Sequence, residues 1–153
     1  MATLLDGRYA LGEKPVASGG HALLYRGSDM DRDNDIVAVK IFRGGHLHDD
    51  RILTAAWTAE LTAYQQIRED ENLTKLLDFG RDDEGAPYLV FEWMPSDLAK
   101  YLPTLELTGW DDFWPIARGI LRGLAVLHSG GFVHRDIKPG NVLIDSEGRI
   151  KVA

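Results

Sequence analysis

The sequence contains no cysteine, which excludes disulfide bonds and thiolate metal sites. It has no apolar run near the ~18 residues of a membrane-spanning helix. Its start, MATLLDGRYALGEK, lacks the basic and apolar regions of a signal peptide. Positive charge is also scarce, because 17 Lys and Arg residues stand against 24 Asp and Glu residues, for a net charge of −7. Because nucleic-acid phosphates bind basic faces, we expect no nucleic-acid partner. The lack of cysteine, of a membrane span and of a signal peptide leads us to expect a cytoplasmic chain with, in this segment, no membrane partner.

What the sequence does contain is the composition of a soluble globular protein, with 44% hydrophobic and 27% charged residues in 153 positions. This length is enough for one domain with a sizeable core. The segment 52–67 has helical spacing, which places Leu53, Trp57, Glu60 and Tyr64 on one face. Five other segments are rich in β-forming residues and are separated by turns: YALGEKPVA, ALLYRGSD, DIVAVKIF, KLLDFG and PYLVFEWM.

Helices and loops dominate the remaining residues. SDLAKYL predicts a short helix, and 112–129 predicts a longer one that ends at Gly130-Gly131. Gly119 and Gly123 lie inside this helix at a spacing that permits close contact with another element. A hairpin is expected around DSEGR. The sequence therefore predicts an α+β fold, in which a five-stranded antiparallel sheet with one helix is followed by the start of a helical part.

Two charged residues occur in apolar surroundings. Lys40 lies in IVAVKIF, where Ala38 and Phe42 should share its face of the strand. Glu60 lies within the apolar stripe of the segment 52–67. Because an unpaired charge is costly to bury, these positions suggest a buried Lys40–Glu60 ion pair. The alternative is a Lys40 on an exposed strand edge and a Glu60 that reaches solvent.

The stretch HRDIKPGNVLI, residues 134–144, places a carboxylate, an ammonium group and an amide close together at Asp136, Lys138 and Asn141. Phosphoryl transfer uses these groups. A carboxylate accepts the proton of the attacking hydroxyl, a lysine offsets charge on the transferring phosphate, and an amide oxygen binds Mg²⁺. The stretch resembles the catalytic loop H-R-D-x-x-x-x-N of eukaryotic-type (Hanks-type) serine/threonine protein kinases.

This resemblance extends along the whole chain and implies a protein-kinase-like fold. It implies a nucleotide-binding N-lobe over residues 1–93, and a hinge with a partial helical C-lobe over residues 94–153. It also implies ATP and Mg²⁺ as cofactors and a protein substrate with a Ser or Thr hydroxyl. The lysine two positions after the aspartate, Lys138, is similar to that of the serine/threonine-specific members.

The resemblance also implies a role for individual residues. Asp136 corresponds to the catalytic base, Asn141 to the metal ligand, and Arg135 to the arginine that contacts a phosphorylated activation loop. Lys40 corresponds to the lysine that holds the α- and β-phosphates, and Glu60 to its partner on the helix. The remaining positions would surround adenine, through the backbones of Glu92 and Met94 beside a gatekeeper at Phe91, and through the apolar side chains of Ala38, Leu24 and Leu143.

The phosphate-binding loop is the weaker match. The family pattern is G-x-G-x-x-G-x-V, whereas ASGGHALL has Ala17 at the first glycine, Gly19 at the second, Ala22 at the third and Leu24 at the valine. Alanine disfavours the positive φ angles that glycine permits. We therefore expect a degenerate loop that still binds ATP, with lower affinity than a loop with three glycines.

The triplet Asp78-Phe79-Gly80 looks like the magnesium-binding Asp-Phe-Gly of the family but precedes the catalytic loop, so it is interpreted as a strand end with a turn glycine. The sequence stops at Ala153, where the family's triplet would begin. The expectation is a catalytic domain truncated just before that motif and inactive by itself. A missing C-terminal part would complete such a domain. Three alternatives remain open: a catalytically silent nucleotide-binding or interaction module, a piece completed by a complementing chain, and a small-molecule phosphotransferase of kinase-like fold.

A second possible ligand cluster, GGHLHDD with His46 and His48, is interpreted as an exposed loop rather than a metal site.

Overall fold

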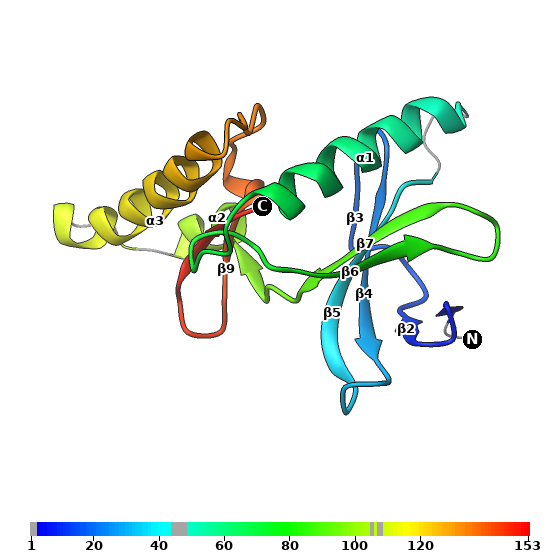
Figure 1. Ribbon diagram of the computed structural model, residues 1–153. Helices are drawn as coiled ribbons and strands as arrows, with labels where there is room; N and C mark the ends of the chain where they lie inside the picture. The colour runs from blue at the N-terminus through cyan, green and yellow to red at the C-terminus, as the bar shows by residue number, and fades with distance from the viewer. Residues whose placement is uncertain (1–2, 44–48, 105, 107–108) are drawn as a thin grey trace. The chain divides into compact units, whose positions relative to one another are not determined.

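The computed structural model describes residues 3–43, 49–104, 106 and 109–153 (Figure 1). His46 and His48 lie outside the described residues. The chain forms two compact units, the first from Met1–Tyr64 and Leu76–Trp93 and the second from Gln65–Lys75 and Met94–Ala153. Within the described part of the chain, no helix combines the length and apolarity needed to cross a membrane.

The first unit is an antiparallel sheet with one long helix, α1 (Asp50–Gln66). The strand order is β1-β2-β4-β5-β7-β6, and β3 pairs with β4 outside this order. The strands are β1 (Thr3–Leu5), β2 (Tyr9–Leu11), β3 (Ala17–Ser18), β4 (Leu23–Asp29), β5 (Asp35–Ile41), β6 (Leu76–Arg81) and β7 (Pro87–Glu92).

The sheet has seven strands, so the sequence-based count of five is corrected in two places. The segment YALGEKPVA forms two short strands, β2 and β3, because Pro15 has no backbone N–H with which to continue the ladder. The additional strand β1 folds back onto β2 through a turn at Asp6 and Gly7, whose φ angles are 52° and 67°. The overall fold class is unchanged by these corrections.

The two faces of the sheet pack differently because alternate residues of a strand point to opposite sides. On one face, Val37, Val39 and Ile41 of β5 join a core that includes Tyr9 and Tyr88. The opposite face lies against α1, where the packed residues are Ala38, Phe42, Leu53, Leu61, Leu89 and Phe91. Lys40 belongs by alternation to the face that α1 covers, as the sequence pattern predicts.

The second unit contains the short helix α2 and the 20-residue helix α3, with a small antiparallel sheet in the order β10-β9-β8. Its helix α3 begins two residues before the predicted range, and Gly131 beyond its end has a φ of 80°. The elements are β8 (Ser96–Asp97), α2 (Leu98–Tyr101), the 3-10 helix η1 (Leu102–Thr104), α3 (Trp110–Ser129), the 3-10 helix η2 (Pro139–Asn141), β9 (Val142–Ile144) and β10 (Ile150–Val152).

The glycines of α3 form a packing face, as their spacing predicts. A Cβ at Gly119 would lie 2.6 Å from the Cβ of Ile150, and a Cβ at Gly123 would lie 2.5 Å from the backbone oxygen of Asn72. Both distances are too short for any larger side chain, so glycine lets α3 approach β10 and the segment 65–75. This segment begins with the last two residues of α1 but belongs to the second unit. One contact that holds it there is the hydrogen bond from the Val152 N–H to the Asn72 backbone oxygen at 2.8 Å.

Candidate functional site

Lys40 and Glu60 form the ion pair that the sequence suggests, from β5 to α1. Lys40 Nζ lies 2.8 Å from Glu60 Oε1 and 2.6 Å from Oε2. The ammonium group also lies 5.3 Å from the centre of the Phe42 ring. The expectation of a buried pair is corrected in one respect, because the two side chains remain 32% and 28% exposed. Water therefore reaches the pair, and its contribution to stability falls below that of a buried ion pair.

The loop between β3 and β4 is a tight turn. The Gly19 N–H donates to the Ala22 oxygen at 2.9 Å, and Ala17 pairs with Leu24 across the two strands. No residue from Ala17 to Ala22 has a positive φ angle. Alanine at positions 17 and 22 therefore causes no backbone strain in this conformation. A Cβ at Gly20 would meet nothing within 4 Å, so the turn leaves open space around its backbone.

The residues that the resemblance assigns to adenine occur in both units. In the first, Ala38 is buried and Leu24 is partly buried in the cluster that faces α1, and Glu92 ends β7. In the second, Met94 is buried and Leu143 is the central residue of β9, paired with Lys151.

Asp136, Lys138 and Asn141 converge within the second unit. Lys138 Nζ donates to Asp136 Oδ2 at 2.7 Å. Asn141 Nδ2 donates to the same oxygen at 2.8 Å and to the Asp136 backbone oxygen at 2.8 Å. The bend that makes this possible is η2, which begins at Pro139 just after the extended Lys138. The hydrogen bond from Lys138, and then that from Asn141, lowers the pKa of the Asp136 carboxyl.

The arrangement around Asp136 is suited to a proton acceptor that remains ionised at neutral pH. Its side chain is 62% exposed, so a substrate hydroxyl can reach it from solvent. Because the Asn141 amide nitrogen faces Asp136, the amide oxygen is the group left to bind a cation. Such an oxygen fits a Mg²⁺ ion that is held partly by nucleotide phosphates. Within the described ranges, no cluster of three or more His, Cys, Asp or Glu side chains could hold a metal by itself.

His134 is a residue of this site to which the sequence analysis gave no role. Its Nδ1 accepts the Asp136 N–H at 3.2 Å, and its Nε2 lies 2.7 Å from the Ala153 oxygen. Because Nδ1 accepts, the proton is on Nε2, which donates to Ala153. The Ala153 N–H in turn donates to the backbone oxygen of Asn141 at 3.1 Å. The end of β10 thus holds the loop at two points. The signal that could have identified His134 from the sequence is its position as the histidine of the H-R-D motif.

Arg135 adopts a φ angle of 66°, which is unusual for a residue with a side chain. Such backbone strain of about 1–3 kcal/mol persists only where neighbouring contacts enforce it. Here the contacts of His134 and Asp136 on either side supply that constraint.

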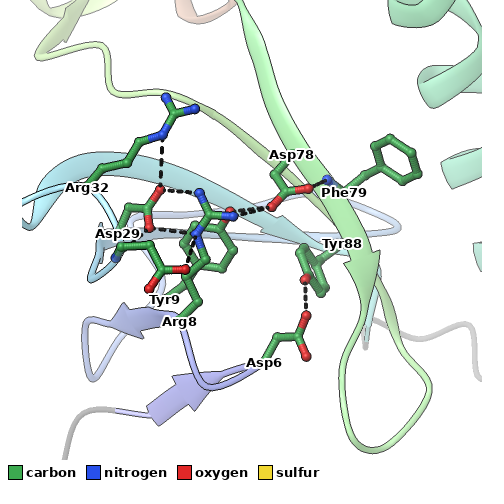
Figure 2. A network of polar contacts seen from close by, with 9 residues as sticks. Asp6, Arg8, Tyr9, Asp29, Arg32, Asp78, Phe79 and Tyr88 are labelled. Atoms are coloured by element: carbon green, nitrogen blue, oxygen red, sulfur yellow. Dashed lines mark hydrogen bonds and ion pairs between the residues drawn. The ribbon is translucent and has the colours of Figure 1, made fainter.

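Asp78 does not join the site but belongs to a polar network in the first unit (Figure 2). Its Oδ2 accepts from Tyr9 Oη at 2.6 Å and from Arg8 Nη1 at 2.9 Å. Arg8 also contacts both oxygens of buried Asp29 at 2.7 Å. The triplet lies at the C-terminal end of β6, as interpreted, but Gly80 is a strand residue paired with Tyr88 and not a turn glycine. A Cβ at Gly80 would lie 2.6 Å from Tyr88 Oη. Burial, and then the bond to Asp78, raises the pKa of Tyr9.

Comparison with known proteins agrees with this geometry. The model of the protein kinase domain family matches residues 13–153. The serine/threonine-protein kinase PknL of Mycobacterium tuberculosis (strain ATCC 25618 / H37Rv) is 34% identical over 154 residues, which cover 99% of this chain and 37% of PknL. The probable serine/threonine-protein kinase PknB of Lactococcus lactis is 32% identical over 140 residues, which cover 91% of this chain and 22% of that protein.

A similar protein of Bifidobacterium longum, also a probable serine/threonine-protein kinase PknB, is 34% identical over 161 residues, which cover 97% of this chain and 22% of that protein. The chain therefore spans well under half the length of these relatives. The family match nevertheless covers almost all of its residues, including the Lys40–Glu60 pair and the loop of Asp136. The chain belongs to the protein kinase domain family.

Proposed function

We propose that the protein phosphorylates serine or threonine hydroxyls of other proteins, with ATP as the donor and Mg²⁺ as the metal. The observation that carries this proposal is the convergence of Lys138 and Asn141 on one oxygen of Asp136. This set offers a proton acceptor, a cation for the phosphate and an amide oxygen for a metal in one exposed loop. These are the groups that phosphoryl transfer needs.

Each residue of the loop has a separate task in this proposal. Asp136 accepts the proton of the attacking hydroxyl and orients its oxygen. Lys138, which holds Asp136 in the free protein, moves its charge towards the transferring phosphate. Asn141 keeps the carboxylate in place through its amide nitrogen and contributes its oxygen to the metal. Bound Mg²⁺ neutralises phosphate charge.

The first unit would position the nucleotide. Lys40, oriented by Glu60, would contact the α- and β-phosphates. Because the Lys40–Glu60 pair is partly exposed, the ammonium group can give up part of its contact with Glu60 and bind an anion instead. The turn at Gly19 would present backbone N–H groups to phosphate. Ala38 and Leu24 of this unit would give adenine an apolar environment, and the Glu92 backbone a hydrogen bond. The family resemblance assigns the same two tasks to Leu143 and Met94 of the second unit. Arg135 would contact a phosphorylated segment. ATP supply and the lack of cysteine favour the cytoplasm as the compartment.

The test is phosphate transfer from labelled ATP to a mixture of proteins by a version of the protein with the complete catalytic domain, and by Asp136→Asn in that version, because the 153-residue chain is expected to be inactive by itself. General-base groups contribute about 10²–10⁴-fold, so the variant should lose activity by that factor. Its thermal stability should stay unchanged, because Asp136 is exposed. Retained activity in Asp136→Asn would refute the assignment. Transfer to aminoglycosides and not to proteins would favour a small-molecule phosphotransferase, and ATP binding without any transfer would favour a silent module.

The degenerate phosphate loop is tested by the double variant Ala17→Gly, Ala22→Gly. We expect tighter ATP binding by the variant, because bound phosphate can call for backbone angles that alanine resists. The observed turn has no positive φ angle, so the gain should appear only on nucleotide binding. Isothermal titration of both proteins with Mg-ATP measures it. Equal affinities would show that glycine at these positions is unimportant.

A further inference from the structure

A cavity of about 230 Å³ opens in the first unit at one end of the sheet, among β1, the β2–β3 turn, the start of β4, the end of β5 and the β6–β7 hairpin. Its apolar lining comes from six strand residues, of which Leu5, Leu11 and Ile41 are buried and Leu23 and Tyr25 are partly buried. The sixth, Leu4, is 51% exposed. None of the residues that line this cavity takes part in the proposed reaction.

The rim of the cavity is strongly acidic. Five carboxylates line it against a single guanidinium, that of Arg43. Arg43 is itself engaged, because it forms ion pairs with Asp82 and, at 3.0 Å, with Glu84. Anionic partners such as phosphates, nucleic acid or acidic lipids are therefore repelled from this opening. The five acidic residues are Asp6, Glu13, Asp82, Asp83 and Glu84.

The walls of the cavity are fixed before any partner binds. On one side, Asp82 accepts the Ala86 N–H at 2.8 Å and the Glu84 N–H at 3.0 Å, which holds the hairpin in shape. On the other side, Tyr88 Oη donates to Asp6 at 3.0 Å, which ties the β1–β2 turn to the core. A preformed cavity lowers the entropic cost of binding.

A metal ion does not fit this site. Among the described residues, no three of the acidic groups form a cluster that could hold an ion. A complete small-molecule cofactor is also unsuited, since the volume of about 230 Å³ lies below the ~300–1,000 Å³ of such sites. The lining combines apolar side chains with polar groups, and its apolar part, here called the apolar floor, can contact one or two large side chains of a partner.

We propose that this cavity is a docking site for a basic, amphipathic peptide segment of a partner protein. An apolar side chain of the segment fills the cavity between Leu4 and Leu23, and flanking lysine or arginine residues face the acidic rim. The charge of the rim selects the partner, and the apolar floor supplies the burial that holds it. The site is separate from the proposed catalytic residues and does not depend on phosphoryl transfer.

The probe is a fluorescein-labelled short peptide of alternating lysine and leucine, which contains no hydroxyl to be phosphorylated. Its fluorescence anisotropy is measured with the purified protein at low and high ionic strength. We expect binding that weakens with salt, because exposed charge pairs are screened. Two matched peptides complete the set: one has glycine in place of leucine, and the other has glutamate in place of lysine. Both should bind at least about tenfold more weakly, since each lacks one of the two required features.

Four variants locate the site. Asp83→Lys reverses an exposed rim charge and should weaken binding about five- to tenfold. Leu4→Ser removes half-exposed apolar surface at the opening and should weaken it about threefold or more. The controls make the same changes at the opposite end of β5, outside the cavity, as Asp35→Lys and Ile36→Ser. These should change the affinity less than about twofold.

Equal loss in the rim variants and the β5 controls would overturn the proposal, because binding would then follow the net charge alone. Equal affinity of the lysine–glycine peptide would overturn it as well, since the cavity would be unused. Displacement of the peptide by the polyamine spermine at similar concentration would likewise assign the surface to small cations and refute a peptide site. Thermal melting of every variant, with midpoints near the wild-type value, excludes unfolding as the cause of a loss.

Discussion

Replacement of Asp78 by alanine distinguishes a structural aspartate from a metal ligand. The structure gives Asp78 three contacts, with Tyr9 Oη, Arg8 Nη1 and the N–H of Phe79. Tyr9 is 1% exposed, so loss of its acceptor leaves a buried hydroxyl unpaired, which costs about 1–3 kcal/mol. The Arg8 contact is partly exposed and contributes less than about 1 kcal/mol. Water can replace the contact with Phe79.

We therefore expect Asp78→Ala to lower the free energy of unfolding by about 2–3 kcal/mol. For a chain of this length that corresponds to a melting temperature lower by roughly 5–10 °C. Urea unfolding followed by circular dichroism measures the free energy. The matched control is Asp83→Ala in the neighbouring hairpin, an exposed carboxylate whose loss should be nearly neutral.

A double-mutant cycle with Tyr9→Phe isolates the tyrosine contact. In the Tyr9→Phe background, Asp78→Ala should cost about 1 kcal/mol less than in the wild type, because no hydroxyl remains to be left unpaired. Below the melting range, magnesium-dependent ATP binding should be the same in Asp78→Ala and wild type. The reasoning is refuted if the variant keeps full stability, or if it loses magnesium dependence instead.

Three further perturbations test other parts of the structure. Gly123→Ala should destabilise the protein. Overpacking against the Asn72 backbone oxygen costs about 1–3 kcal/mol, which outweighs the ~1 kcal/mol gained in helix propensity. A higher melting temperature would contradict this packing. A cycle of Lys40→Met and Glu60→Gln, followed by urea unfolding, should give a coupling of about 1 kcal/mol, at the upper end for an exposed pair and below the 3–5 kcal/mol of a buried one. A value near zero would refute this contribution to stability. The hydrogen bond from Arg8 lowers the pKa of Asp29 below its ordinary value of 3.8. The stabilisation from ionised Asp29 is therefore present above pH 3.8 and is lost as the pH falls through the lowered pKa. Urea midpoints between pH 7 and pH 3 should fall less for Asp29→Asn than for wild type, and parallel curves would refute the assignment.

Local patterns were enough to predict most elements of the fold. The alternation in DIVAVKIF placed Lys40 beside Ala38 and Phe42, and helical spacing placed Glu60 in an apolar stripe. These two periodicities suggested the ion pair but left open the alternative of two solvent-exposed side chains, and the structure shows the pair. The glycine spacing in 110–129 likewise predicted a close approach, because a missing Cβ has the same consequence in any helix. Strand ends were less predictable. The division of YALGEKPVA and the added β1 depend on hydrogen bonds to distant partners.

The candidate site shows the same division. The types and spacing of Asp136, Lys138 and Asn141 occur in one short stretch, so the sequence alone was enough to predict a phosphoryl-transfer loop. The hydrogen bond between His134 and the backbone of Ala153, which supports that loop, could be found only in the folded structure. The two residues are 19 positions apart in sequence and meet where β10 ends.

The Asp-Phe-Gly triplet marks the limit most clearly. Its position before the catalytic loop was enough to predict that Asp78 is not the metal ligand, because the order of motifs along the chain can be seen in the sequence. Only the tertiary structure decided what Asp78 does instead. Its partners Arg8 and Tyr9 lie about seventy residues away in the chain, and long-range contacts of polar side chains leave no periodic signal that a single sequence can carry.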